Sequence, residues 1–162
     1  MKHSTCFALI FAAAVLSGSL VSAHAEAVSP AVQTATRNES DGRRTSMRIS
    51  IKLGAKVITA SLTDSATSRD FVSLLPITTE LEDYAATEKI GYLPRKLSAV
   101  GAPAGIEPAT GDVTYYAPWG NLALFHKDFR YSSGLIPLGK IESGLEAVRE
   151  PGSGTATIEL ID

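Results

Sequence analysis

The amino-acid sequence predicts a mainly β domain, a closed or nearly closed antiparallel barrel of seven or eight strands whose ends are covered by two short helices. Between residues 46 and 162, short apolar or alternating segments are separated by turn residues, which is typical of an all-β barrel. The two helical stretches do not alternate with strands, so a doubly wound parallel sheet is not expected. Because residues 46–162 contain no cysteine, a hydrophobic core must hold the domain together without disulfides.

The first elements of the domain are a predicted hairpin and a short helix. Met47–Leu53 alternates apolar and polar residues with period two, and Val57–Leu62 follows a turn as the second strand. The period then becomes helical, with Thr67 as the expected N-cap and Asp70 in a position like that of a capping box. Pro76 disfavours helical geometry at the residue before it, so the helix is expected to end there.

The middle of the domain is predicted to contain four strands and a long loop. Ile77–Tyr84 and the shorter Glu88–Leu93 are the first two strands. Residues 94–110 are rich in Gly, Ala and Pro and are predicted to be a loop. Asp112–Tyr116 and Asn121–Phe125 are the next two strands, joined by a short turn.

The last elements are a strand, a short helix and a final strand. Leu135–Ile141 is the predicted strand. Ser143 and Glu146 have the spacing of an S-x-x-E capping box and are expected to open the helix, which ends at Pro151. Ala156–Leu160 alternates apolar and polar residues and completes the barrel.

Residues 1–25 have the order of features found in a secretory signal peptide. Lys2 supplies a positive start, residues 7–16 are an apolar run, and Ala23-His24-Ala25 is an A-x-A cleavage site. The apolar run is shorter than the about 20 residues that a membrane span needs. We therefore expect cleavage after Ala25 and a periplasmic or secreted protein without a stable membrane anchor. The alternative is a signal that is retained as an N-terminal anchor.

Residues 26–45 are predicted to form a disordered tether, because they lack the large apolar residues that offset the entropy of ordering.

Cleavage would remove Cys6, His3 and His24 and leave His126 as the only histidine. A thiolate nucleophile, a Cys-ligated metal and a site with several histidines are then excluded. The acidic residues lack the spacing of a Ca²⁺ loop, so we expect neither a metal nor a cofactor. A net charge of −2 with scattered charges argues against nucleic-acid binding.

Several short motifs are spread across residues 46–162. They are Glu88-Lys89 with Tyr92-Leu93-Pro94, residues 111–116 (GDVTYY), residues 118–121 (PWGN), residues 127–129 (KDF) and residues 133–135 (SGL). Together they resemble a bacterial group of small cyclophilin-like proteins, and the resemblance covers nearly the whole domain. Residues 122–125 and 138–148 also resemble the pocket-floor strand and the final strand-turn-helix of cyclophilins. The resemblance implies a closed eight-stranded cyclophilin-like barrel with a short capping helix at each end.

The sequence departs from the prolyl-isomerase cyclophilins at the motifs that those enzymes use. Gly111-Asp112 matches the end of their Gln-Gly-Gly-Asp stretch, but no segment matches their F-H-R, M-A-N or W-L-D…H stretches. In the isomerases, the Arg of F-H-R supports the twisting amide. Arg95 lies in roughly the corresponding region of the chain, in a different context, and is the candidate for that role.

Five residues are candidates for ligand binding. Tyr116 and Trp119 belong to an aromatic cluster that could stack on a proline ring or a flat ligand, although Trp119 could instead close the barrel end. Phe125 ends the strand that the resemblance assigns to a pocket floor. His126 could contact a ligand or act in acid–base chemistry, or be an exposed strand-end residue. Arg95 could donate paired hydrogen bonds to a carbonyl or carboxylate, or be a solvated loop residue.

Two functions are compatible with these residues. The first is a non-catalytic binding module that holds a peptide segment or a small ligand near Arg95, Tyr116, Trp119, Phe125 and His126. The second is a weak peptidyl-prolyl cis-trans isomerase in which Arg95 polarises the amide and Phe125 holds the proline ring, without a cofactor. The resemblance also makes a flavodoxin-like redox partner conceivable, since similar domains occur beside such proteins.

Overall fold

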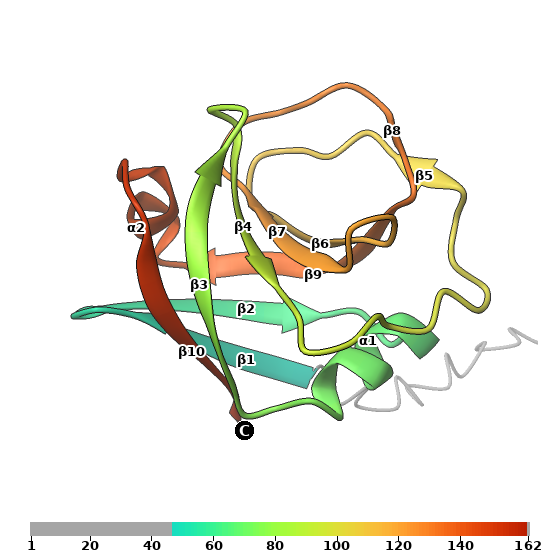
Figure 1. Cartoon of the computed structure of the whole chain (residues 1–162), viewed down its shortest axis with the longest axis horizontal. Coiled ribbons are helices and arrows are strands. Elements are labelled where there is room, and N and C mark those ends of the chain that lie inside the picture. Colours follow the sequence, from blue (N-terminus) through green and yellow to red (C-terminus); the bar gives the residue numbers. More distant parts are fainter. Residues whose placement is uncertain (1–46, 162) are drawn as a thin grey trace, which may run out of the picture. The chain divides into compact units, whose positions relative to one another are not determined.

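A computed structural model describes residues 47–161 of the chain. The predicted signal peptide (1–25) and tether (26–45) lie outside the described residues. The predicted fold class is confirmed: eight antiparallel strands form a closed barrel in the order β1-β10-β3-β4-β7-β6-β9-β2 (Figure 1). These barrel strands are β1 (Met47–Leu53), β2 (Lys56–Leu62), β3 (Ile77–Tyr84), β4 (Glu88–Tyr92), β6 (Asp112–Tyr116), β7 (Asn121–Phe125), β9 (Leu135–Ser143) and β10 (Gly154–Ile161).

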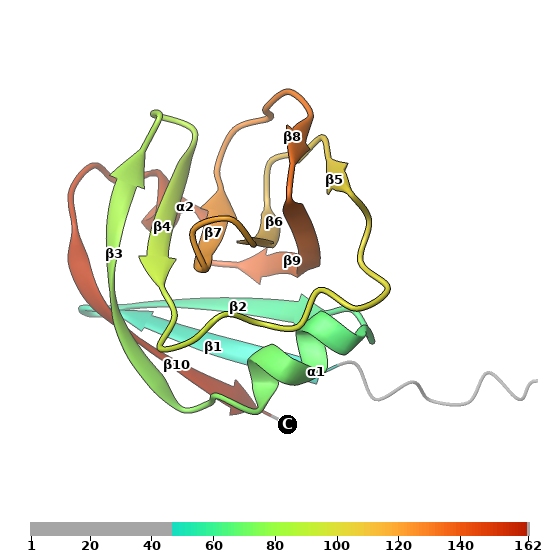
Figure 2. The same cartoon turned by 45° about the vertical axis from the view of Figure 1, so that its right-hand side comes forward.

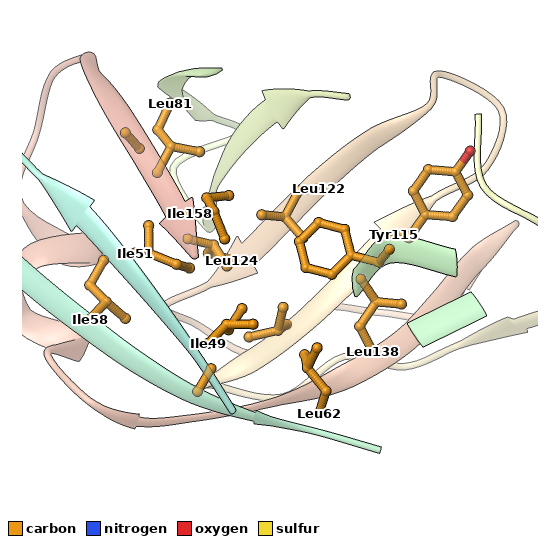
Figure 3. Packing of buried hydrophobic residues seen from close by; sticks show 14 of the residues in the cluster. Ile49, Ile51, Ile58, Leu62, Leu81, Tyr115, Leu122, Leu124, Leu138 and Ile158 are labelled. Carbon is orange, nitrogen blue, oxygen red and sulfur yellow. The ribbon is translucent and has the colours of Figure 1, made fainter. Parts of the chain in front are cut away.

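The barrel core comes from the alternation that the sequence shows along each strand. Ile49 and Ile51 of β1 are fully buried and lie opposite Ala60 and Ile58 of β2, while the residues between them face outward. The C-terminal strand β10 pairs with both β1 and β3, which closes the barrel. Figure 3 shows side chains from seven of the strands converging inside it: Ile49, Ile51, Ile58, Leu62, Leu81, Tyr115, Leu122, Leu124, Leu138 and Ile158.

Two short helices, α1 (Ala66–Val72) and α2 (Leu145–Arg149), pack against the barrel as predicted. Phe71 of α1 and Val148 of α2 are fully buried and belong to the same hydrophobic core as the strand residues. Each helix therefore covers apolar side chains that the barrel strands alone would leave exposed. Neither of the helices in residues 47–161 has the length and apolar character that crossing a membrane requires.

Both predicted helix starts are wrong in detail. The N-cap of α1 is Ser65, whose Oγ accepts a hydrogen bond from the Ser68 amide at 3.0 Å, whereas Thr67 is buried inside the helix. Helix α2 begins after Gly144 without a side-chain cap, because the Ser143 hydroxyl hydrogen-bonds Thr59 Oγ1 at 2.7 Å instead. The α1 cap is thus a local pattern of Ser65 with Ser68, two residues before the expected one, whereas the α2 cap is absent because Ser143 bonds a residue far away in the chain.

Two segments that lack any periodic pattern form a small second sheet. Strand β5 (Gly105–Ile106) lies within the predicted loop 94–110, and β8 (Ser132–Ser133) precedes β9. They pair antiparallel with each other rather than with the barrel. Figure 2 shows them on the side of the barrel away from β1 and β10, where the chain before β8 runs above β6 and β7.

Candidate functional site

A pocket of about 320 Å³ lies on the outer face of the barrel wall formed by β4, β7 and β6. This volume is at the lower end of the range for small-molecule sites, so the pocket suits a small ligand or one side chain of a peptide. Its walls come from the turn after β3, the turn after β6 and the segment between β7 and β8. The lining residues are Tyr84, Ala85, Glu88, Ile90, Tyr116, Trp119, Asn121, Ala123, Phe125, Phe129, Arg130, Ser132 and Leu135.

The floor of the pocket follows from strand alternation and register. Glu88 and Ile90 of β4 lie opposite Phe125 and Ala123 of β7. Because alternate residues of a strand share a face, all four side chains point out of the barrel, away from the main core. They are nevertheless buried, and the three apolar ones form a second hydrophobic cluster with Leu135. The outer face of this wall is therefore covered by protein, while the small side chain of Ala123 keeps space open at its centre.

Three aromatic rings form one wall of the pocket. The Trp119 ring makes edge-to-face contacts with Tyr84 on one side and with Tyr116 on the other, each at a centroid distance of 5.4 Å. Gly120 closes the turn that carries Trp119, since its amide donates to the Tyr116 carbonyl at 2.8 Å and its φ of +78° favours glycine. Trp119 is 46% exposed and Tyr84 is 41% exposed, so this wall also borders solvent.

The opposite wall is the segment that follows β7. Phe129 packs against the second hydrophobic cluster, and the Arg130 guanidinium lies 5.4 Å from the centre of the Phe129 ring. Asp128 anchors this segment to the preceding loop, because its carboxylate accepts hydrogen bonds from the Thr110 amide at 2.7 Å and the Thr110 hydroxyl at 2.8 Å. These two hydrogen bonds lower the pKa of Asp128. The wall is thus held by specific contacts and positions Arg130 at the pocket.

Glu88 is a buried carboxyl group at one end of the pocket floor. It is 7% exposed and accepts a hydrogen bond from the neighbouring Thr87 hydroxyl. None of the ion pairs among residues 47–161 includes Glu88, although Arg130 lines the same pocket. Burial raises the pKa of the Glu88 carboxyl, and the Thr87 hydrogen bond opposes that rise in part.

Asn121 is a second buried polar group, toward the other end of the floor. It is 1% exposed, and its Nδ2 donates to the Leu122 carbonyl at 3.2 Å. Its Oδ1 is buried without a hydrogen-bond partner, the one such side-chain atom among residues 47–161. An unsatisfied buried acceptor costs about 1–3 kcal/mol, so its presence beside a pocket calls for a reason other than stability.

The turn between β3 and β4 places Ala85 at the pocket in a conformation that is unusual for alanine. Ala85 and Ala86 have φ values of 50° and 57°, in the left-handed region, and the Thr87 amide donates to the Tyr84 carbonyl at 3.2 Å. A two-residue hairpin turn with both central φ values positive favours Asn-Gly rather than Ala-Ala. The backbone conformation that carries Tyr84 and Glu88 is therefore imposed by the surrounding structure.

Of the five residues predicted to form the site, Tyr116, Trp119 and Phe125 line this pocket and Arg95 does not. Arg95 donates to both Asp70 carboxylate oxygens, at 2.6 and 3.0 Å, and also to Ser73 Oγ at 3.1 Å. The Ser98 amide donates to the same carboxylate at 2.6 Å. These contacts lower the pKa of Asp70 to about 2 and connect α1 to the loop after β4.

His126 also lies outside the pocket lining. It directly follows Phe125, the last residue of β7, and neighbouring residues along a strand point to opposite faces. Its amide donates to the Thr87 carbonyl at 2.9 Å. The charges that act on its ring belong to Lys127, Asp83, Lys89 and Arg149. Burial, followed by the positive charge of Lys127, lowers the pKa of His126, so the ring is neutral at pH 7.

The structure adds two polar pocket residues that the sequence did not single out, Glu88 and Asn121. Adjacent charged residues such as Glu88 and Lys89 usually lie on the surface, but here both are buried. Lys89 points to the inner side of β4, where its Nζ donates to Asp83 Oδ1 and to the Gly152 carbonyl, both at 2.6 Å. The alternation of Glu88 with Ile90 was the available signal, but it does not show which face becomes covered.

Within residues 47–161, no three His, Asp or Glu side chains come together in a way that could hold a metal ion. The pocket groups are instead suited to hydrogen bonding, ring stacking and apolar contact: one carboxyl, one amide oxygen, one guanidinium and several aromatic rings.

Comparison with known proteins identifies the fold and a family. No curated protein sequence matches this chain. The solution structure of a hypothetical protein from Archaeoglobus fulgidus is similar with a TM-score of 0.54 and 19% identity, covering 74% of this chain and 99% of that one. That likeness shows the fold alone. The model of the cyclophilin-like family matches residues 51–159, which contain six of the barrel strands completely and parts of β1 and β10. The chain therefore belongs to the cyclophilin-like family.

Proposed function

We propose that this domain is a binding module that holds a small ligand or a side chain of a peptide in the pocket over β4, β7 and β6. The observation that carries the proposal is the composition of the pocket floor. Two polar groups, the Glu88 carboxyl and the Asn121 amide, are buried there among apolar side chains, and Asn121 Oδ1 has no partner within residues 47–161. Pockets that bind small molecules combine an apolar lining with a few polar groups in this way.

The energetic cost of these polar groups supports a binding role. A buried carboxyl without a cation and a buried acceptor without a donor both reduce stability relative to apolar residues of similar size. The barrel does not depend on either group, since its core is formed by the opposite faces of the same strands. A ligand that supplies the missing hydrogen bonds would offset this cost when it binds.

The aromatic wall provides a direct test of binding. Trp119 is the only tryptophan in the chain and lines the pocket, so its fluorescence reports on occupancy. Titration with proline-containing peptides and with small aromatic compounds should change the Trp119 emission for at least one of them. The variant Ala123→Leu fills the centre of the floor and should abolish the response.

The matched control is Ala55→Leu, the same change on the exposed turn between β1 and β2. It should bind as the unmodified domain does. A full panel without any change in Trp119 emission, or a response that survives Ala123→Leu, would contradict the proposal.

Export is part of the same proposal and has its own test. The motif of residues 1–25 supports cleavage after Ala25 and a periplasmic or secreted location. Mass spectrometry of the protein from its native cell should give a mature N-terminus at Glu26. A protein that still carries residues 1–25 would contradict export by this route.

A weak prolyl isomerase is the second candidate, and one observation favours keeping it. Arg130 and Phe125 line the same pocket, so a proline amide bound there would have a guanidinium and an aromatic ring nearby. Arg95 is instead engaged by Asp70, so Arg130 replaces it as the group to test. A protease-coupled isomerisation assay decides the matter: activity lost in Arg130→Ala and kept in Arg95→Ala supports isomerisation, and no activity in the unmodified domain rejects it.

A further inference from the structure

We propose that the preferred ligand of this pocket is an organic ammonium, with its positive nitrogen at the Glu88 carboxylate and its apolar body over Ile90 and Ala123. This inference rests on the proposed binding function and names the chemical class that the site would select. Three features carry it: the unpaired state of Glu88, the rings beside it, and the placement of Arg130.

Glu88 is the first feature, because a buried carboxylate needs a positive partner. The seven ion pairs found among residues 47–161 use seven other carboxylates, and five of these are at least one-third exposed. The single hydrogen bond from Thr87 leaves most of the acceptor positions of the Glu88 carboxylate free. An ammonium group with several N–H donors supplies both the missing charge and the missing hydrogen bonds.

The rings beside Glu88 are the second feature. In the strand register Glu88 lies opposite Tyr84 of β3 on one side and Phe125 of β7 on the other. Trp119 contacts the Tyr84 ring and completes the aromatic surface at this side of the pocket. Aromatic faces attract cations, and the attraction grows when the cation is shielded from water. A carboxylate placed between aromatic rings therefore favours a cation with an apolar body and disfavours an anion.

Arg130 is the third feature, because it is the one cationic side chain in the described pocket lining. Its guanidinium lies over the Phe129 ring on the opposite wall and makes no ion pair with Glu88. Glu88 and the rings of Tyr84, Trp119 and Phe125 thus stay available to a ligand. The repulsion between Arg130 and a bound ammonium weakens binding, so removing that charge should tighten it.

Three probes of almost the same shape separate the ammonium from the rest of the ligand: phenethylamine, 2-phenylethanol and phenylacetate. Titration of the domain at pH 7.5, followed by Trp119 fluorescence, should show phenethylamine binding at least about 10-fold more tightly than 2-phenylethanol, with phenylacetate weakest. The isosteric Glu88→Gln should lose that preference and bind phenethylamine and 2-phenylethanol within about 2-fold of each other.

A second variant keeps the inference testable if Glu88→Gln does not fold. Arg130→Gln should increase the preference for phenethylamine over 2-phenylethanol several-fold. Lys127→Gln is the matched control, since Lys127 is an exposed cation on the same segment and does not line the pocket. It removes the same charge and should alter neither ligand.

Two results would overturn the inference, and they differ from failure of the binding function itself. Equal affinity for phenethylamine and 2-phenylethanol, or a preference for the amine that persists in Glu88→Gln, shows that the pocket binds ligands without selecting an ammonium. Absence of a Trp119 response to these probes and to every compound and peptide of the wider panel would contradict the binding function as well.

Discussion

The two faces of strand β7 differ in chemistry although both are buried. Leu122 and Leu124 point into the barrel and pack in the main hydrophobic core. Asn121, Ala123 and Phe125 point outward and meet a pocket, with one polar, one small and one aromatic side chain. Burial alone would assign all five residues to the core. Under the proposed function, the polar and small residues on the outer face leave room for a ligand.

The same contrast separates two carboxyl groups. Asp70 lies next to Arg95 and Ser98, and its pKa is lowered to about 2. Glu88 lies in the pocket without a cation, and burial raises its pKa. Ionised Asp70 therefore stabilises the fold, whereas ionised Glu88 destabilises it. Substitution of the two carboxyl groups should therefore change the stability of the fold in opposite directions.

The substitution with the largest expected effect on stability lies on the inner face of β7. Leu124→Ala leaves a cavity in the main core and should lower the free energy of unfolding by about 2–5 kcal/mol. Urea unfolding of the purified domain measures the change. The folded fraction should still bind ligand with unaltered affinity, because Leu124 points away from the pocket. Weakened binding by fully folded Leu124→Ala would contradict the assignment of stability to the inner face and of binding to the outer face.

Asp70→Asn should give the next largest loss, a decrease of several degrees in Tm at pH 7. The carboxylate charge that binds Arg95 and the Ser98 amide disappears in this variant. Because the folded pKa of Asp70 is lowered to about 2 from 3.8, its contribution is complete above about pH 4 and is lost as the pH falls toward 2. The Tm difference between the two proteins should vanish over that range, and a difference that is constant down to pH 2 would exclude this origin.

Glu88→Gln should have a smaller effect of opposite sign, a gain on the order of 1 kcal/mol at pH 7. The folded protein holds the Glu88 proton more tightly than the unfolded chain, so the unmodified domain loses stability as the pH rises above 4.5 through the raised pKa. The gain should therefore be absent at pH 4 and appear by pH 7. Thermal unfolding at both pH values measures it, and a loss at pH 7 would mean that ionised Glu88 has a stabilising partner.

The smallest expected effect on stability belongs to Asn121→Leu. Leucine has a similar shape, removes the unsatisfied Oδ1 and gives up only the hydrogen bond to the Leu122 carbonyl. The free energy of unfolding should change by less than about 1 kcal/mol. Ligand affinity should fall. Leu124→Ala, in contrast, should lower stability and leave affinity unaltered. A stability loss as large as that of Leu124→Ala would place Asn121 among the structural residues.

The sequence predicts the barrel because most of its strands carry a local signal. Alternation in residues 47–53 and 156–160 and the apolar run of residues 121–125 determine strand positions within a residue or two. The two-residue strands β5 and β8 are too short to show any period. The predicted α2 cap is wrong because Ser143 hydrogen-bonds Thr59 of another strand, a contact between residues far apart in the chain. The α1 cap, Ser65, in contrast belongs to a local pattern with Ser68.

The site is less predictable for a related reason. Tyr116, Trp119 and Phe125 follow from their type and from the resemblance, and the structure brings them together. Glu88 becomes a pocket residue only because β4 pairs with β7 and because the segment after β7 covers that face. Arg95 lies outside the pocket because it forms hydrogen bonds with Asp70 of helix α1. Each of these outcomes depends on tertiary contacts that no local pattern encodes.

The most direct test of the division between the two faces is an NMR titration of the ¹⁵N-labelled domain with phenethylamine. The predicted result is that amide shifts change at Glu88, Ile90, Trp119, Asn121 and Phe125, which surround the pocket, and stay unchanged around Asp70 and Arg95. Shift changes centred on Arg95, or none at the pocket with the amine and with every other ligand tried, would contradict the assignment of the outer face as the functional site.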